Sequence, residues 1–286
     1  MTYSIVARDA ATGELGAAVQ SRAFATGRAT LWVLADVGAV ATQSFSEQSY
    51  GPLGLELMRA GKPPELALAG LVRADPHEAF RQVAFLSASG AAAAHTGAAC
   101  IEAAGHVLGE GFSAQGNMLA STTVPAAMAG AFTDTGGPLA LRLLAALEAA
   151  QGAGGDWRGQ QAGRIVVVEP GAQPWQRVSD VRVDDHPRPL EELRRLLHLE
   201  RGYRRLARLG TGASAQDEVA EAARAGLAPV DVAWAALSAA CAAGDRGEAR
   251  RRFEQLLAFD ARYAEVVRRR PALAEPLGIE AVEGAP

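Results

Sequence analysis

A β-strand is predicted directly after Met1, and no other feature of this sequence constrains the fold as strongly. Residues 2–8 are strand-like, residues 9–14 have the composition of a turn, and residues 15–19 have the pattern of a returning strand. A chain that enters a hairpin at its second residue should place the start of that strand inside a sheet. The sequence therefore predicts a β-rich core that begins at residue 2.

Thr2 gives this strand a chemical meaning as well. Its small size permits removal of Met1, and a terminal Thr then carries a hydroxyl nucleophile and an α-amino base in one residue. The reference pKa of about 8 makes that amine a usable base near neutral pH. The alternative is that Thr2 is an ordinary strand residue near a chain end, and both interpretations stay open here.

The bulk composition excludes several classes of protein. The 286 residues carry a net charge of −4 with a pI of about 5.8, so nothing indicates a nucleic-acid or anionic-membrane partner. No apolar run is long enough to span a bilayer, and no signal peptide is visible, so a cytoplasmic protein is expected. Two isolated cysteines and five histidines without metal-ligand spacing predict no disulfide framework, metal or cofactor.

The chain changes character near residue 188. Before it, blocks of short strands alternate with helix pairs, in the order two hairpins, two helices, strands, two helices, strands. The unbroken apolar run 165–168 is typical of a strand buried on both faces. This order predicts an α+β fold in which antiparallel sheets are covered by helices on one or both outer faces.

After residue 188 the sequence is rich in Ala, Leu, Glu and Arg with helical periodicity. Part of it resembles one tetratricopeptide-type helical hairpin, expected to bury Leu237, Phe253 and Leu256. We expect a domain over residues 1–204 and a helical region over residues 205–286. A single hairpin is short, so this region should depend on the first domain or on a second chain. Helices are expected at 189–209, 216–225, 229–243, 248–259 and 262–269.

Polar residues interrupt otherwise apolar strands at three places, and a fourth polar group precedes a buried strand. The strand-end residues are Thr42, Gln43, Ser44, His95, Thr96, Gln115 and Asn117, and the fourth group contains Asp156 and Arg158. Because polar groups at strand ends often line sites, we expect Gln43, His95, Asn117 and Asp156 to converge near Thr2. Each could instead be a turn residue or a satisfied structural polar group.

Taken together, several segments resemble one family. They are Tyr3–Asp9 with Thr12–Glu14, Gly38–Gln43, Tyr50–Pro52, His95–Gly97, Gln115–Asn117, Gly155–Gly159 and Val183–Pro187. This family is domain of unknown function 1028, whose members resemble N-terminal-nucleophile (Ntn) hydrolases. The resemblance implies an αββα four-layer sandwich and hydrolase chemistry, and it covers roughly residues 1 to 200. The helical tail resembles an extension described in part of the family as peptidoglycan-binding.

The resemblance and the strand-end pattern together give a set of expected site residues. Thr2, Ser4, Asn117 and Asp156 are expected to be catalytic, and Gln43, Ser44, Tyr50, His95, Thr96, Gln115 and Arg158 to bind substrate. Backbone N–H groups, together with Asn117 or Gln43, would stabilise an oxyanion. One position departs from the family pattern: Ala162-Gly163 follows the Arg-Gly-x-Gln stretch, where relatives often have Ser-Ala. A hydroxyl that could assist is therefore absent.

Two functions follow as expectations. The first is an amidase-type hydrolase, without metal or cofactor, that acts on a small-molecule or peptide-like amide and forms a homo-oligomer, such as a dimer. The second is a non-catalytic binding protein on the same scaffold, with the helical tail binding a partner or a peptidoglycan fragment. Retention or loss of Met1 in the purified chain separates the two.

Overall fold

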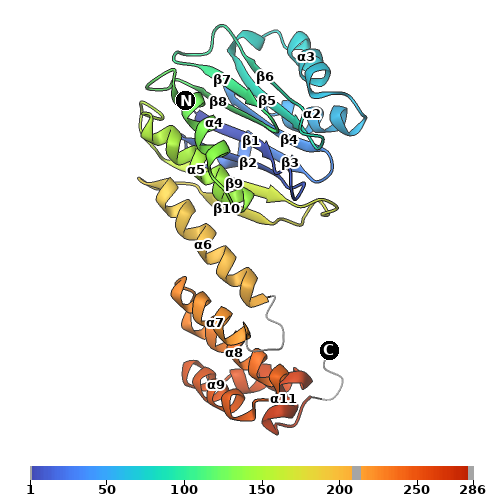
Figure 1. Cartoon of the computed structure of the whole chain (residues 1–286), viewed down its shortest axis with the longest axis vertical. Helices are drawn as coiled ribbons and strands as arrows, with labels where there is room; N and C mark the ends of the chain where they lie inside the picture. The colour runs from blue at the N-terminus through green and yellow to red at the C-terminus, as the bar shows by residue number, and fades with distance from the viewer. Residues whose placement is uncertain (1, 208–213, 283–286) are drawn as a thin grey trace. The chain divides into compact units, whose positions relative to one another are not determined.

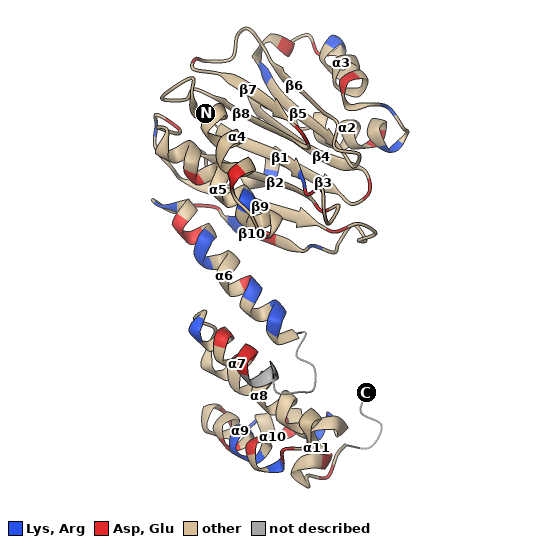
Figure 2. Cartoon of the chain, viewed as in Figure 1, with Lys and Arg blue, Asp and Glu red and all other residues tan. Residues whose placement is uncertain are grey.

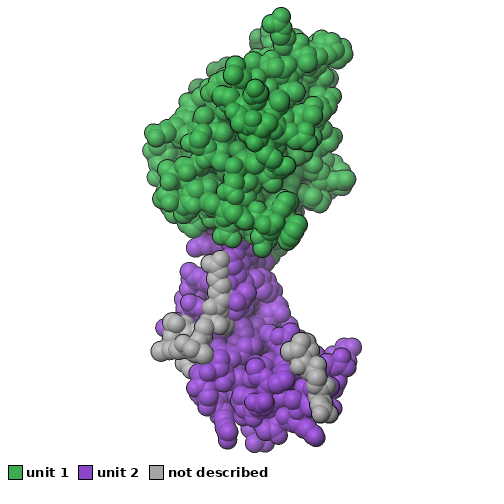
Figure 3. Space-filling view, turned by 90° about the vertical axis from the view of Figure 1, so that its right-hand side faces the viewer, with its two compact units in different colours: residues 1–197 green, residues 198–286 purple. Residues whose placement is uncertain are grey.

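The computed structural model describes residues 2–207 and 214–282 and has a mixed α+β architecture. It divides into two compact units, residues 1–197 and residues 198–286 (Figure 3). The strands described in the structure all lie in the first unit, which also contains the candidate site residues. The second unit is helical in its described residues.

The first unit contains a six-stranded sheet in which every neighbouring pair is antiparallel. The strand order is β10-β9-β2-β1-β8-β7, so the strand that begins at Thr2 lies in the middle (Figure 1). The strands are β1 (Thr2–Arg8), β2 (Leu15–Ser21), β7 (Gly105–Gly109), β8 (Phe112–Asn117), β9 (Ala162–Val168) and β10 (Ser179–Val183). The predicted hairpin of residues 2–19 is present as β1 and β2.

A second, four-stranded antiparallel sheet has the order β3-β4-β5-β6. Its strands are β3 (Leu31–Leu34), β4 (Gly38–Ser44), β5 (Arg81–Ser87) and β6 (Ala92–Thr96). The two sheets face each other across an apolar layer to which both contribute, including Val6 and Val19 from one sheet and Ala41 and Leu86 from the other. Side chains that alternate along β1 therefore point either into this inter-sheet layer or away from it.

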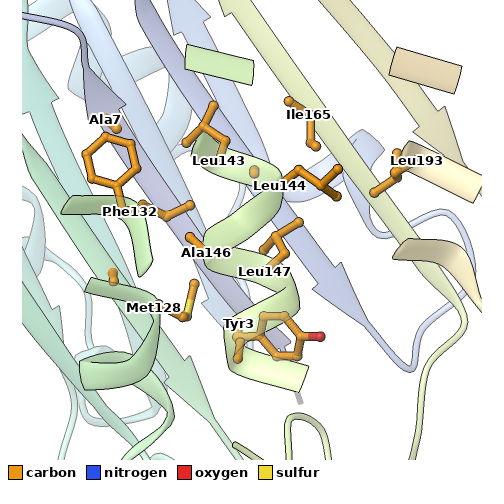
Figure 4. Packing of buried hydrophobic residues seen from close by; sticks show 14 of the residues in the cluster. Tyr3, Ala7, Met128, Phe132, Leu143, Leu144, Ala146, Leu147, Ile165 and Leu193 are labelled. Atoms are coloured by element: carbon orange, nitrogen blue, oxygen red, sulfur yellow. The ribbon is translucent and has the colours of Figure 1, made fainter. Parts of the chain in front are cut away.

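Helices cover the outer face of each sheet. On the six-stranded sheet lie α4 (Val124–Asp134) and α5 (Leu139–Gly152), and on the four-stranded sheet lie α2 (Tyr50–Arg59) and α3 (Pro64–Ala74). On α5, Leu143, Leu144 and Leu147 recur at helical spacing and pack over Tyr3 and Ile165 (Figure 4). The central strands are thus buried on both faces, and β1 has no solvent-exposed side between Thr2 and Ala7.

Short helices complete the first unit: α1 (Gly27–Thr30), the 3-10 turn η1 (Glu78–Phe80) and the first half of α6 (Pro189–Ala207). Leu190, Leu193 and Leu197 on α6 belong to the same apolar cluster as α5. The boundary between the two units therefore falls inside α6, and the expected boundary at 204/205 lies in the same helix.

The second unit contains the end of α6 and the helices α7 (Ser214–Arg224), α8 (Pro229–Ala243), α9 (Arg246–Phe259), α10 (Tyr263–Arg268) and α11 (Pro271–Leu277). The predicted hairpin corresponds to α8 and α9, and Leu237 and Leu256 are fully buried in it, with Phe253 partly buried. Helices α10 and α11 contribute Val267 and Leu273 to that cluster. Arg and Glu residues, coloured on the ribbon of Figure 2, recur along α6.

Candidate functional site

Thr2 lies at the start of β1 with its side chain on the inter-sheet face. Its cross-strand partners are Ser21 at the end of β2 and Asn117 at the end of β8. The Thr2 hydroxyl donates a hydrogen bond to Ser21 Oγ over 3.0 Å, and Thr2 is only 7% exposed. The hydroxyl of residue 2 is therefore held where the strands of both sheets end, and we call this end of the two sheets the Thr2 edge.

A network of three buried amide side chains joins the two sheets at this edge. The Oε1 atom of Gln82 accepts hydrogen bonds from Gln43 Nε2 at 2.8 Å and from Asn117 Nδ2 at 2.9 Å. Gln43 Nε2 also donates to the carbonyl oxygen of Thr2 over 3.1 Å. We call Gln43, Gln82 and Asn117 the amide network. It fixes the backbone of Thr2 in place.

Ser4 and Gln115 extend this polar layer one step further along the strands. The Ser4 hydroxyl donates to Gln43 Oε1 over 2.7 Å, and Gln115 Nε2 donates to Ser4 Oγ over 3.3 Å. Ser4 thus lies on the same face as Thr2, but its oxygen already takes part in two hydrogen bonds. Its position supports a structural role more than a nucleophilic one.

One acceptor of the amide network is buried without a partner among the described residues. This atom is Oδ1 of Asn117, the residue directly opposite Thr2 in the sheet. Buried polar atoms nearly always have a hydrogen-bond partner, so an unpaired one at a candidate site marks a place for a donor. An ammonium or amine group at the start of β1 is such a donor.

Thr96 contacts the network from the edge strand β6. Its Oγ1 accepts a hydrogen bond from Gln82 Nε2 at 3.1 Å and lies 2.9 Å from Nδ1 of His106 on β7. Gln82 Nε2 donates to the carbonyl oxygen of Gly116 as well, over 2.8 Å. The polar layer therefore reaches from Thr2 to the edge strands β6 and β7.

Asp156 and Arg158 form an ion pair of 3.2 Å on the loop before β9. The Asp156 carboxylate is completely buried and accepts hydrogen bonds from the backbone N–H groups of Arg22 at 2.9 Å and Arg158 at 2.8 Å. Burial, and secondly the charge of Asp156, raise the pKa of the Tyr3 phenol well above its ordinary value. Asp156 thus fastens the loops beside the start of β1, and its oxygens are already engaged.

The structure does not bring every expected site residue to Thr2. His95 alternates with Thr96 and points to the helix-covered face, where its Nε2 lies 2.9 Å from the carbonyl oxygen of Glu78 and 3.1 Å from the Glu78 carboxylate. Ser44, with a φ of 70°, hydrogen-bonds Cys100. Tyr50 donates to Asp75 over 3.3 Å. Of the four residues expected to converge, Gln43 and Asn117 therefore lie beside Thr2, Asp156 is joined to Arg22 next to Ser21, and His95 points away. Ser44 and Tyr50, which were expected to bind substrate, contact other residues.

Two residues of this site were not among the expected ones. Gln82 is absent from the expected set, and Ser21 lies just beyond the predicted returning strand of residues 15–19. The available signal is the cross-strand pairing: Gln43 lies opposite Gln82 and Thr2 opposite Ser21. Two polar residues opposite each other in a buried sheet are expected to bond.

Of the side-chain donors expected to stabilise an oxyanion, Gln43 Nε2 uses both of its N–H groups within the protein, whereas Asn117 Nδ2 makes one hydrogen bond among the described residues. Asn117 Nδ2 donates to Gln82, and Gln43 Nε2 donates to Gln82 and to the Thr2 carbonyl. Within residues 2–207 and 214–282, no group of three or more His, Cys, Asp or Glu side chains is arranged to hold a metal ion. In the same residues no helix has both the length and the apolarity required to cross a bilayer.

Comparison with known proteins gives a consistent result. A crystal structure of the DUF1028 protein SPO2555 from Silicibacter pomeroyi is 33% identical in sequence and superimposes with a TM-score of 0.64. The matched region covers 68% of this chain and 87% of the SPO2555 chain. No curated protein matches the chain. The model of the family of unknown function DUF1028 matches residues 2–193, which span the two sheets and the start of α6. The chain therefore belongs to the DUF1028 family.

Proposed function

We propose that the first unit is a hydrolase of the N-terminal-nucleophile type that cleaves an amide bond with Thr2 as its nucleophile. The observation that carries the proposal is the place of Thr2: first residue of a central strand, on the inter-sheet face, opposite Asn117. The helix pairs outside the two facing sheets support relating this unit to the αββα four-layer sandwich of that superfamily.

The chemistry requires removal of Met1, which frees the α-amine of Thr2. That amine accepts the proton of the Thr2 hydroxyl while Oγ1 attacks the carbonyl carbon of the amide. The tetrahedral intermediate collapses to an ester on Thr2, and the leaving amine takes the proton. Water then hydrolyses the ester and restores the hydroxyl. Each step balances with the amide and water alone.

The surrounding groups have assignable parts in this scheme. The unpaired Oδ1 of Asn117 is the proposed acceptor for an N–H of the freed α-amine of Thr2. This hydrogen bond would orient the lone pair of the amine nitrogen. Gln43 is a positioning residue, because it binds the Thr2 carbonyl oxygen and not the hydroxyl. The free cysteines Cys100 and Cys241, both buried, fit a reducing compartment, so we propose that the protein acts in the cytoplasm.

A second candidate is a binding protein without catalysis, in which the helical unit binds a partner or a peptidoglycan fragment. One observation favours it: both N–H groups of Gln43 Nε2 already donate within the protein, to Gln82 and to the Thr2 carbonyl oxygen, which leaves Gln43 no donor for an oxyanion. In that case the amide network only holds the sheets together.

Intact-mass measurement followed by a variant series tests the proposal. We expect the purified chain to lack Met1 and to hydrolyse at least one member of a panel of p-nitroanilide amides. Thr2→Ala, which leaves Met1 removable, should reduce turnover by at least about 10³-fold, and Thr2→Ser should retain most of it. Ser4→Ala tests the neighbouring hydroxyl.

Thermal unfolding of each variant controls for loss of structure. Retained Met1 on the whole population, or turnover that survives Thr2→Ala, would contradict the assignment of Thr2. Turnover that disappears with Ser4→Ala in a folded protein, but not with Thr2→Ala, would move the nucleophile to Ser4.

A further inference from the structure

Large apolar side chains are exposed on the loops around Thr2. They are Phe24, Phe45, Phe80, Ile101 and Trp157, which are between 42% and 69% exposed, and we call them the apolar rim. Phe24 follows β2, Phe45 follows β4, Phe80 precedes β5, Ile101 follows β6 and Trp157 precedes β9. Five loops that leave one edge of the two sheets thus each present an apolar group.

Hydrogen bonds show that these loops meet at the Thr2 edge. Phe45 N donates to the Phe80 carbonyl at 3.4 Å, and the two rings pack edge to face with centroids 5.7 Å apart. Met118, the residue after Asn117, donates its N–H to the Ile101 carbonyl at 2.8 Å. The loop of Trp157 is tied to the end of β2 through Asp156, which accepts from Arg22 N.

Single exposed apolar residues are ordinary on a protein surface, but a group of them at one place usually marks a binding site. Trp175, on the loop between β9 and β10, is exposed at the opposite end of these strands. The strands that the rim loops join end in the buried amides and hydroxyls around Thr2. Apolar groups beside polar ones suit a ligand with a polar amide and apolar substituents.

We propose that the apolar rim binds the apolar substituent of an amide ligand, such as the acyl chain of an N-acyl amide. Placing its carbonyl at Thr2 rests on the proposed function, whereas binding by the rim does not require any reaction. The rim residues come from separate loops with exposed polar side chains between them, including Arg22, Ser46 and Arg158. A narrow ligand can use such separated contacts, while a stable second copy needs roughly 800 Å² of continuous surface on each partner.

The test is a binding series on the full-length Thr2→Ala protein, which cannot form the ester. Calorimetric titration with N-acylglycinamides from acetyl to octanoyl should give an affinity that rises about 2- to 4-fold per added methylene. Phe45→Ser and Trp157→Ser should flatten that rise. Trp175→Ser is the matched control, because Trp175 is 78% exposed at the opposite edge of the sheet and should leave the rise unchanged.

The outcomes separate this inference from the proposed function. The role of the rim is wrong if the amides do not bind or if their affinity is independent of acyl chain length. It is also wrong if the increase of affinity with chain length survives both rim substitutions. If sedimentation shows that the rim variants turn a dimer into a monomer and the amides do not compete with dimerisation, the occupant is a second copy and the inference fails. If the rim binds acyl chains while the wild-type protein shows no turnover, the role of the rim is supported and the assignment of Thr2 as nucleophile is wrong.

Discussion

At the scale of single residues, the ion pair between Asp75 and Arg81 predicts how the stability of the protein depends on pH. Arg81 Nε donates to its carboxylate over 2.8 Å, and both side chains are nearly buried, at 10% and 13% exposure. The hydrogen bond from Arg81 lowers the pKa of Asp75 below its ordinary value of 3.8. A lowered folded-state pKa means that this pair stabilises the protein above pH 4 and that the contribution is lost as pH falls through the folded-state pKa.

We therefore expect Asp75→Asn to lower the melting temperature at pH 7 but to differ less from the wild type near pH 2. Asp134→Asn is the control, because Asp134 is exposed at the end of α4. Thermal unfolding followed by circular dichroism between pH 2 and pH 7 measures both. An equal loss at every pH would show that Asp75 acts by packing and not by its charge.

The same scale shows what could be predicted of the site. Thr2, Gln43 and Asn117 were recognisable because each ends or begins a strand. His95 was assigned to the wrong face, since Thr96 and not His95 points between the sheets. Neighbouring residues of a strand face opposite sides of the sheet. The sequence therefore identifies His95 and Thr96 as candidates, but the choice between them requires knowing which face of the strand lies between the sheets.

At the scale of elements, one glycine of α2 and one glycine of α3 are predicted to respond in opposite ways to substitution by alanine. A Cβ on Gly54 would lie 2.3 Å from the Phe85 ring, whereas a Cβ on Gly70 of α3 would meet nothing within 4 Å. Gly54→Ala should lower the free energy of unfolding by about 1–3 kcal/mol through overpacking. Gly70→Ala should raise it by up to about 1 kcal/mol through helix propensity. Denaturant titration measures both, and a stabilising Gly54→Ala would mean that α2 moves freely on the sheet.

Most elements were predictable because prolines, glycines and periodicity mark them. The predicted helix at 229–243 agrees with α8, where Pro229 begins the helix and Gly244, with a φ of 72°, ends it. The short elements α1, η1 and α11 were missed. Three to seven residues carry too little periodicity to be recognised, and Pro276 inside α11 argues against a helix.

At the scale of the whole molecule, the second unit allows a test by truncation. Leu199 and Leu206 on the end of α6 pack with Val219 and Leu227, and Tyr203 donates to Asp231. We expect fragment 198–286 to unfold cooperatively on heating, and fragment 205–286, which lacks Leu199 and Tyr203, not to do so. Circular dichroism with sedimentation to establish the monomer is the measurement. A cooperative transition in the shorter fragment would contradict the need for α6.

The layered order of sheets and helices could be predicted, but the strand order could not. Alternating blocks of strands and helix pairs indicate covered antiparallel sheets, and this α+β class is what the structure has. The pairing of β1 with β8 joins residues more than a hundred positions apart, such as Ser4 and Gln115. Distant pairings leave no local mark, so a single sequence cannot choose among the possible neighbours of β1.

The amide network also has a consequence for the order of folding. Gln82 is bonded to Gln43 in its own sheet and to Asn117 in the other sheet, 39 and 35 positions away in the chain, so its bond to Asn117 can form only when the two sheets have met. Contacts that depend on such completed topology usually form after the rate-limiting step. Gln82→Met should therefore accelerate unfolding and leave the refolding rate nearly unchanged in stopped-flow experiments. A slower refolding rate would instead place the network in the nucleus. By this reasoning, the surroundings of Thr2 are among the last parts of the molecule to assemble.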